Sequence, residues 1–385
     1  MGDEQRLSPD ELMAQARERF ASATDFTVAV EEEFAILDPA SLDLTNRFED
    51  VLAAARGTSL EQHLVGELIA SEVEVRTGRQ ETFADIPNVM AERRAELRAL
   101  VEPMGLLLGA TGTHPWADWK RQRIIDTPHY RRNDELLRYV VWRNNTFGLH
   151  VHVAINGPDR AIAVVAAMRN FLPELLALSA SSPFVEAVNT GLHSARTQIF
   201  TRFFPRCGVP DAFSSWSEYE TFVRFLYDTR SITEPTQLWW SVRPHFAFPT
   251  VEIRICDGQP ELAEAQSLAA FATALTARVA RAYDEGAPIE PLPHRLIEEN
   301  FWRAIRWGLA GELVDFERSE PIPARQRIEE LIEWVLPVAG EIGAAPYLAV
   351  PDQNAAERQI ERFESGASLE EIYAEQVRAT ETIGG

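Results

Sequence analysis

The stretch FTVAVEEEFAIL, residues 26–37, decides the fold class, because its side chains alternate between the two faces of an extended strand. Its valine, phenylalanine and isoleucine residues share one face, whereas Glu31 and Glu33 share the other. Glu32 breaks this alternation. We therefore expect either a bulge at Glu32 or a position for Glu32 near the open end of the strand. The stretch predicts a strand with one apolar face and one carboxylate-bearing face.

Three further stretches show the same division into an apolar and a polar face. They are ELIASEVEVRT (67–77), FGLHVHVAI (147–155) and TVEIRICD (250–257). Solvated strand faces usually carry Lys, Thr, Ser and Gln, but the polar faces of these strands carry only Glu, His and Arg. We therefore predict that the four polar faces meet on one surface of a sheet. Their residues are Glu31, Glu33, Glu72, Glu74, Arg76, His150, His152, Glu252 and Arg254.

The order of strand and helix signals predicts an α+β fold. A fifth strand signal is LWWSVRPHF (238–246), and the strands are too far apart and too irregular for a meander or a regular βαβ alternation. We expect one mixed or largely antiparallel sheet flanked by helices. Residues 1–290 hold the strands, and residues 291–385 form a helical part packed on the same domain. The expected helices cover residues 8–20, 85–108, 159–180, 217–228, 260–284, 296–309, 325–335, 355–363 and 369–382.

Composition excludes several classes of function. The 385 residues are 45% hydrophobic, and 59 acidic against 37 basic side chains give a formal charge of -22. Such a chain repels phosphate backbones and anionic lipids, so we expect neither nucleic acid nor membrane as a partner. The two cysteines, Cys207 and Cys256, are too few for a disulfide framework. The N-terminal residues are charged and show no secretory signal. We therefore expect a cytoplasmic protein. The apolar stretch 161–180 is interrupted by Arg169, Pro173 and Glu174, which predicts a core helix.

Carboxylates gathered on one surface repel each other unless a counter-charge is present, and divalent cations are the natural remedy. Oxygen-rich ligation suits Mg²⁺ or Mn²⁺. Alternatively, His150 and His152 could form a zinc site with a carboxylate, as in a metal-dependent amide hydrolase. Neither a P-loop nor a Rossmann fingerprint occurs in the sequence, so metals and arginines on the sheet would have to hold any nucleotide.

Read together, the motifs resemble the carboxylate-amine ligase branch of the glutamate-cysteine ligases, which is related to glutamine synthetase. The resemblance implies a curved, mainly antiparallel sheet, with Mg²⁺ or Mn²⁺ and ATP on its concave face and helices packed on its convex side. It makes residues 1–290 the catalytic domain. The matching segments, in order, are VEEEF (30–34), ELIASEVEVRT (67–77), GTHPWADW (112–119), GLHVHVAI (148–155), LPELLALSASSPF (172–184), SARTQ (194–198), WWSVRPH (239–245), TVEIRICD (250–257) and NFWRAIRWGL (300–309).

The resemblance also implies a reaction and a role for each matched residue. ATP would phosphorylate the carboxylate of one substrate, and an amine would then displace phosphate to form an amide, γ-glutamyl in type. Arg254 and Glu252 would be catalytic, with Arg254 on the γ-phosphate. The implied metal ligands are Glu31, Glu33, Glu67, Glu72, Glu74, His150 and Glu252, and the implied ATP or substrate contacts are Arg76, His152, Arg196, Arg243 and Arg306.

The sequence departs from the common family pattern at four positions, which leaves the acid and the amine substrates open. Val185, Asn189 and Ser241 replace commoner residues, and Arg76 adds a cation beside Glu74. Arg76 either pairs with a carboxylate or meets an anionic ligand. Besides the ligase and the hydrolase, a non-enzymatic binding module is a third reading, and stabilisation by Mg-ATP, by zinc alone or by neither would separate the three. A homodimer is compatible with the sequence, which does not decide it.

Overall fold

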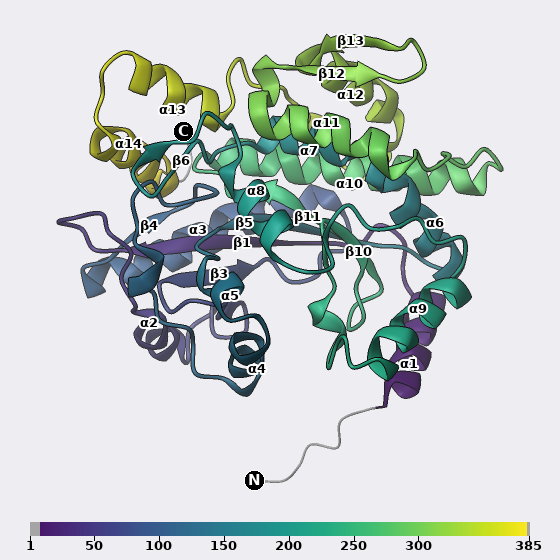
Figure 1. The fold of residues 1–385 in the computed structure, drawn as a ribbon, viewed down its shortest axis with the longest axis horizontal. Coiled ribbons are helices and arrows are strands. Elements are labelled where there is room, and N and C mark those ends of the chain that lie inside the picture. The colour runs from purple at the N-terminus through teal and green to yellow at the C-terminus, as the bar shows by residue number, and fades with distance from the viewer. Residues whose placement is uncertain (1–7, 383–385) are drawn as a thin grey trace.

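The computed structural model describes residues 8–382, and a seven-stranded sheet runs through its centre (Figure 1). The strand order is β10-β11-β5-β1-β3-β2, with β4 paired to β1, and each pair is antiparallel. The predicted α+β class with a mainly antiparallel sheet is therefore confirmed. The strands are β1 (Val28–Leu37), β2 (Leu64–Val65), β3 (Glu72–Arg76), β4 (Leu107–Gly109), β5 (Gly148–Ala154), β10 (Val242–Pro244) and β11 (Thr250–Asp257).

Helices cover one face of this sheet, because that face carries its branched apolar side chains. Val30, Val151 and Ile253 are fully buried there in one core with residues of α6, α7 and α10. The longer helices are α1 (Pro9–Ala21), α2 (Phe48–Ala55), α3 (Ile86–Val101), α4 (Pro128–Leu137), α6 (Pro158–Met168), α7 (Leu172–Ser179), α8 (Ala195–Phe203), α9 (Trp216–Asp228), α10 (Leu262–Asp284), α11 (His294–Trp307), α12 (Ala324–Glu341), α13 (Ala355–Glu364) and α14 (Leu369–Glu381).

Two of the predicted helices differ in how closely the structure follows them, and several short elements complete the chain. Segment 158–179 is long and apolar enough to cross a bilayer, yet 89% of its apolar window is buried inside the protein, which confirms the predicted core helix. The helix expected over 85–108 ends earlier, because Gly105 adopts a positive φ of 67° and the chain then enters β4. Further short elements are α5 (Tyr139–Trp142) and the two-stranded pairs β6 (Phe184–Val185) with β7 (Val188–Asn189) and β8 (Cys207–Gly208) with β9 (Trp239–Trp240).

The C-terminal part is helical, as expected, except for one hairpin. β12 (Glu312–Asp315) and β13 (Glu320–Pro323) form an antiparallel pair that helix periodicity did not predict. Proline at 321 and 323 disfavours a helix there, and Leu313 opposite Ile322 gives the hairpin a buried side. Around it, α11 packs against α7, α12 against α10 and α14 against β4.

Glu32 neither lies in a bulge nor sits at the open end of β1, so both sequence-based explanations are wrong. It pairs in regular register with Val75 and Leu149, and its side chain points to the helix-covered face. Arg94 of α3 neutralises it there, with Nη2 2.6 Å from Glu32 Oε1. The bulge lies instead on β11, between Ile253 and Cys256, where the pairing with β5 shifts register.

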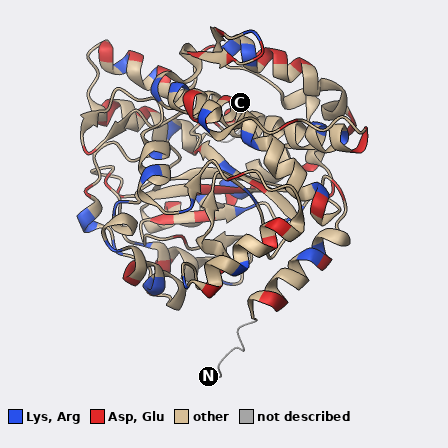
Figure 2. Ribbon diagram, turned by 45° about the vertical axis from the view of Figure 1, so that its right-hand side comes forward, with Lys and Arg blue, Asp and Glu red and all other residues tan. Residues whose placement is uncertain are grey.

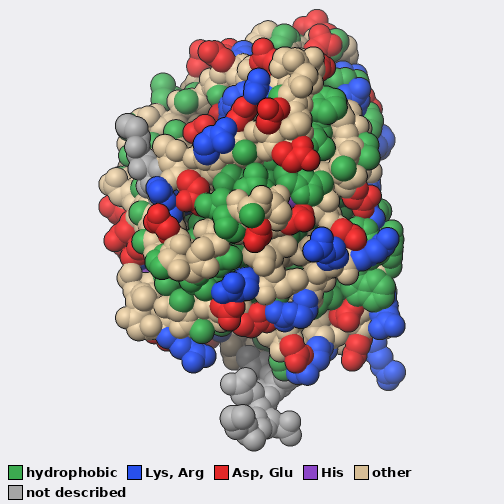
Figure 3. Space-filling view, turned by 90° about the vertical axis from the view of Figure 1, so that its left-hand side faces the viewer, with side chains coloured by type: hydrophobic (Ala, Val, Ile, Leu, Met, Phe, Trp, Pro, Cys, Tyr) green, Lys and Arg blue, Asp and Glu red, His purple; other side chains and the backbone are tan. Residues whose placement is uncertain are grey.

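Charge is distributed differently inside and outside the molecule. Red segments mark acidic residues along the central strands in Figure 2. All of those in β1, β3 and β11 are buried. On the outer face drawn in Figure 3, basic and acidic side chains interleave, and no continuous basic surface covers that face. The acidic cluster is therefore an internal feature of the sheet.

Candidate functional site

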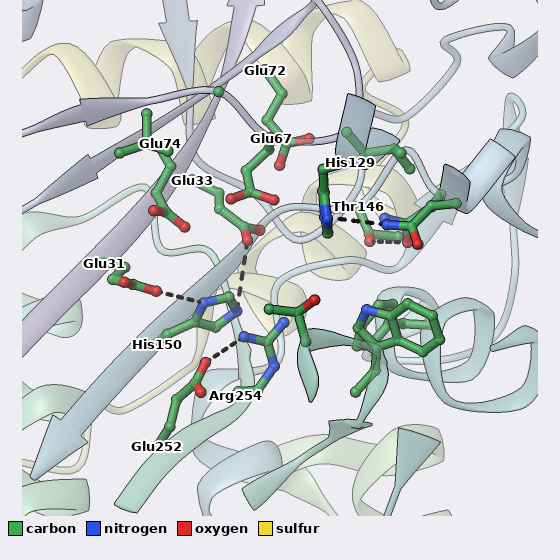
Figure 4. Close-up of a pocket in the computed structure, with 18 of the residues that line it drawn as sticks. Glu31, Glu33, Glu67, Glu72, Glu74, His129, Thr146, His150, Glu252 and Arg254 are labelled. Carbon is green, nitrogen blue, oxygen red and sulfur yellow. Dashed lines mark hydrogen bonds and ion pairs between the residues drawn. The ribbon is translucent and has the colours of Figure 1, made fainter. Parts of the chain in front are cut away.

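Strand register brings the predicted polar residues together on one face of the sheet. Glu31 of β1 lies opposite His150 of β5 and opposite Arg76 of β3. Glu252 of β11 lies opposite His152 of β5. All of them except His152 border a cavity of about 450 Å³, and Figure 4 shows Glu31, His150 and Glu252 around it. Its lining includes the predicted residues Glu31, Glu33, Glu67, Glu72, Glu74, Arg76, His150, Arg196, Arg243, Glu252 and Arg254. His152 borders a neighbouring cavity on the same face.

Two groups of donor atoms have the spacing of metal sites and share Glu31. One oxygen or nitrogen from each of Glu31, Glu74 and His150 lies within 4.8 Å of the others. The same holds for Glu31, His152 and Glu252. The sequence placed His152 among the ATP or substrate contacts, whereas the geometry groups it with two carboxylates.

The hydrogen bonds of His152 support this grouping. Its Nδ1 lies 2.9 Å from Thr250 Oγ1, and its Nε2 has no hydrogen-bond partner among residues 8–382. Nε2 faces Glu31 Oε2 at 3.5 Å and Glu252 Oε1 at 3.9 Å. A buried imidazole with one nitrogen fixed and the other facing carboxylates is a typical metal ligand.

Three carboxyl groups of the cavity resist ionisation. Burial, with the charges of Glu33 and Glu31, raises the pKa of Glu67 to about 7. Burial and neighbouring carboxylates also raise the pKa of Glu72 and of Glu74 well above the ordinary value. A divalent cation would relieve this repulsion, so the residues fit Mg²⁺ or Mn²⁺.

Glu31 and Glu252 are ionised despite their burial. Burial opposes the charge of Glu31, but His152, His150 and Arg76 outweigh it and hold its pKa well below the ordinary value. For Glu252, arginines have the same effect: Arg243 and Arg254 outweigh burial and depress the pKa.

Arginines surround the carboxylates as internal counter-charges. Arg254 forms a close ion pair with Glu252, and Arg243 Nε lies 2.7 Å from Glu252 Oε2. Arg76 Nε lies 2.6 Å from Glu74 Oε1 and 3.1 Å from Glu31 Oε1. The ion-pair alternative for Arg76 is therefore the arrangement observed.

Arg196 reaches the cavity from α8 because Gly148 leaves room for its guanidinium. A Cβ at Gly148 would overlap the guanidinium of Arg196. Arg196 Nη1 donates to the carbonyl of Ile255 at 3.2 Å and lies 3.7 Å from Asp257 Oδ1, while its Nε has no partner among the described residues. Arg196 is thus a buried cation at the cavity wall.

Arg306 does not belong to this site, which corrects the sequence-based expectation. It lies on α11, in the helical layer that packs against α7, and its Nη1 donates to the carbonyl of Gly191. Arg306 is not a lining residue of either cavity on the polar face.

Three of the four residues that depart from the family pattern also lie outside the linings of both cavities. They are Val185, Asn189 and Ser241.

The part of the cavity wall formed by His129 and Tyr130 of α4, here called the roof, was not predicted from the sequence. His129 of α4 pairs with Glu234, Nδ1 to Oε1 at 2.8 Å, and Tyr130 donates its hydroxyl to the carbonyl of Gly66 at 2.8 Å. These contacts join segments far apart in the chain, so strand alternation carries no signal for them. Other lining residues missed by the sequence include Asn133, Val141, Thr146, Phe200, Phe204, Trp239 and Phe248.

A second cavity of about 400 Å³ continues along the same face of the sheet. It shares Glu31, Arg76 and Phe248 with the first, so the two cavities meet at the candidate metal ligands. Its walls are mainly small apolar and hydroxyl side chains. They include Ser22, Ala23, Thr24, Thr27, Val28, Ala29, Ala154 and Thr250.

Comparison with known proteins identifies relatives that match most of the chain. The model of glutamate-cysteine ligase family 2 matches residues 27–375. A protein of Solibacter usitatus named "Putative glutamate--cysteine ligase 2" is 36% identical over 360 residues, which cover 92% of this chain and 93% of that protein. One of Rubrobacter xylanophilus, "Putative glutamate--cysteine ligase 2-3", is 41% identical over 325 residues, covering 84% and 87%.

Solved structures share the fold. A bifunctional glutathione synthetase from Pasteurella multocida superposes with a TM-score of 0.68 at 14% identity, over 96% of this chain and 53% of that chain. The glutamate-cysteine ligase of Francisella tularensis, solved in complex with AMP, gives a TM-score of 0.63 at 12% identity, over 93% and 89%. The expected glutamine synthetase-like fold is confirmed.

Proposed function

Since the chain belongs to glutamate-cysteine ligase family 2, and is therefore a ligase that forms C–N bonds, we propose that it joins a carboxylate to an amine with ATP and Mg²⁺ or Mn²⁺. The observation that carries the proposal is the position of Glu31. This carboxylate is common to two groups of metal-ligand spacing and lies where two cavities meet, beside arginines that suit anions.

The metal ligands in this proposal are the buried carboxylates and imidazoles of the polar face. Glu31, Glu74 and His150 would hold one ion, and Glu31, His152 and Glu252 another. Bound divalent cations would neutralise charge on the phosphates of ATP and on the ligands themselves. Glu33, Glu67 and Glu72 border the same space and complete the acidic group.

We assign the second cavity to the purine and ribose of ATP and the first to the two substrates. Small side chains such as Ala29 and Ala154 leave a flat space, and hydroxyls such as those of Thr27 and Thr250 can bond a ribose. The first cavity carries Arg196, so it suits a substrate carboxylate. This arrangement places the phosphates of ATP over Glu31.

The proposed reaction has two steps, both between the substrates. The γ-phosphoryl group passes to an oxygen of the substrate carboxylate, and ADP leaves. The amine nitrogen then attacks the acyl carbon, phosphate departs with that oxygen, and the nitrogen loses a proton. Arg254 and Arg243 would stabilise the charge that spreads over the phosphoryl oxygens in the first step. No protein nucleophile is required.

Family membership favours the ligase over the metal-dependent hydrolase built on His150 and His152. The four arginines of the first cavity support the same choice, because phosphoryl transfer uses such cations.

We further propose that the partners are small carboxylates and amines rather than nucleic acid or membrane, and that the protein is a cytoplasmic homodimer. Light scattering on the purified protein tests the dimer.

Phosphate release from ATP across a matrix of acids and amines, with Mg²⁺ or Mn²⁺, tests the function. We expect release that depends on both an acid and an amine, with one amide formed per phosphate. The control is Arg254→Ala, which should abolish release while leaving the fold intact. Hydrolysis of amides without ATP, or phosphate release that needs neither substrate, would contradict the proposal.

A further inference from the structure

A third cavity, of about 570 Å³, lies in the helical layer behind the sheet. The start of α7, residues 288–292, Asn300 of α11, the β12–β13 hairpin and α12 form its walls. Its residues line neither of the two cavities on the polar face. Phe171, Leu292, Leu331 and Trp334 make much of the wall apolar, and the rings of Phe171 and Trp334 are stacked with centroids 5.8 Å apart.

The charged residues of this cavity are almost all acidic. Its carboxylates outnumber its one cation, Arg327, by five to one, which leaves a formal charge of -4. A negative concave surface with apolar walls attracts cations and repels anions. The five carboxylates are those of Glu174, Glu290, Asp315, Glu317 and Glu330.

The carboxylate of Glu174 lacks a full set of hydrogen-bond partners in its protein surroundings. Its side chain is 4% exposed, yet only Oε1 has a partner, Arg327 Nε at 3.3 Å. Oε2 has no hydrogen-bond partner among residues 8–382. Burial raises the pKa of this carboxyl group, and Arg327 opposes the change only in part. Buried carboxylates normally have both oxygens bonded, because desolvation is costly.

We propose that this cavity binds an organic cation with an apolar body, its ammonium group against Glu174 and its hydrocarbon part against Phe171 and Trp334. The site is separate from the ligase site and does not depend on the reaction assigned there. A bare metal ion fits less well, because the apolar walls would contribute nothing to its binding. Arg327 is one-third exposed and reaches Glu174 through a single contact, so an incoming ammonium group can replace it.

Titration calorimetry on the full chain with 2-phenylethylammonium tests the proposal. Two control ligands separate the contributions: 2-phenylethanol has the same body without the charge, and methylammonium has the charge without the body. We expect 2-phenylethylammonium to bind at least tenfold more tightly than either. The Glu67→Gln variant, altered only on the polar face of the sheet, should bind it as the natural chain does.

Two substitutions should act in opposite directions. Glu174→Gln removes the charge that the ligand needs and should weaken binding at least tenfold. Arg327→Gln removes the competing cation and should strengthen binding. If the pair is merely structural, both variants lower the midpoint of unfolding and neither changes binding, which overturns the proposal. If Glu174→Gln does not fold, Arg327→Gln and Trp334→Leu test the proposal in its place. Unchanged affinity for 2-phenylethylammonium in both variants would refute the proposal, and so would the absence of binding to the natural chain.

Discussion

Removing one charge from the acidic cavity should stabilise the metal-free protein. The pKa of Glu67 is raised to about 7, against an ordinary value of 4.5, because this half-buried carboxyl group loses much of its hydration and lies beside Glu33 and Glu31. Between these two pH values the unfolded chain is ionised at Glu67 while the folded chain keeps the proton. Stability therefore falls as pH rises from 4.5 through 7, and the full cost is present above 7.

The size of the effect follows from the pKa. At about 1.4 kcal/mol per pH unit, the change from 4.5 to about 7 corresponds to about 3 kcal/mol. Solvent reaches part of Glu67, which screens the charge and leaves roughly 2 kcal/mol. Glu67→Gln should therefore raise the free energy of unfolding by that amount at pH 8, and by less at pH 6.

Urea unfolding with a chelator, at pH 6 and pH 8, measures this difference. Glu364→Gln, at an exposed position of α13, is the matched control and should change nothing at either pH. Adding Mg²⁺ or Mn²⁺ should stabilise the natural chain more than Glu67→Gln, because the ions replace the missing counter-charge. A Glu67→Gln variant that is no more stable than the natural chain at pH 8 without metal would refute the reasoning.

Three further substitutions test other parts of the structure. Arg94→Met leaves Glu32 buried without its partner and should lower the free energy of unfolding, measured in urea, by about 3–5 kcal/mol. The control Arg98→Met, on the same helix but with a side chain 43% exposed, should lower it by at most about 1 kcal/mol, and equal losses would contradict the buried ion pair. Gly148→Ala should displace Arg196 and lower the rate of phosphate release at least tenfold. The control Gly340→Ala, where a Cβ meets nothing within 4 Å, should leave that rate unchanged. Full activity of the Gly148 variant would argue against a role for Arg196. Arg254→Ala should lower turnover by orders of magnitude with little change in the unfolding midpoint, and near-normal turnover would remove Arg254 from the reaction.

The two faces of the sheet could be predicted from the sequence, because side-chain direction in a strand depends only on the parity of the residue number. Glu31 and Glu33 therefore had to share a face, opposite Val30 and Phe34. The assignment of side chains to faces needed local geometry alone. The resemblance of segments along the chain to a known family, rather than geometry, then implied further lining residues such as Glu67, Arg196 and Arg243.

Register, long-range pairs and loops were decided only by the tertiary structure. Glu32 is compensated by Arg94, 62 residues away, so no local pattern could explain a charge on the apolar face. Arg306 matched a family segment, yet the packing of α11 against α7 keeps it away from the cavities. The pairing of His129 with Glu234 in the cavity roof likewise depends on how distant segments pack. Contacts of this kind arise from the packing of the whole chain, which the alternation of neighbouring residues does not encode.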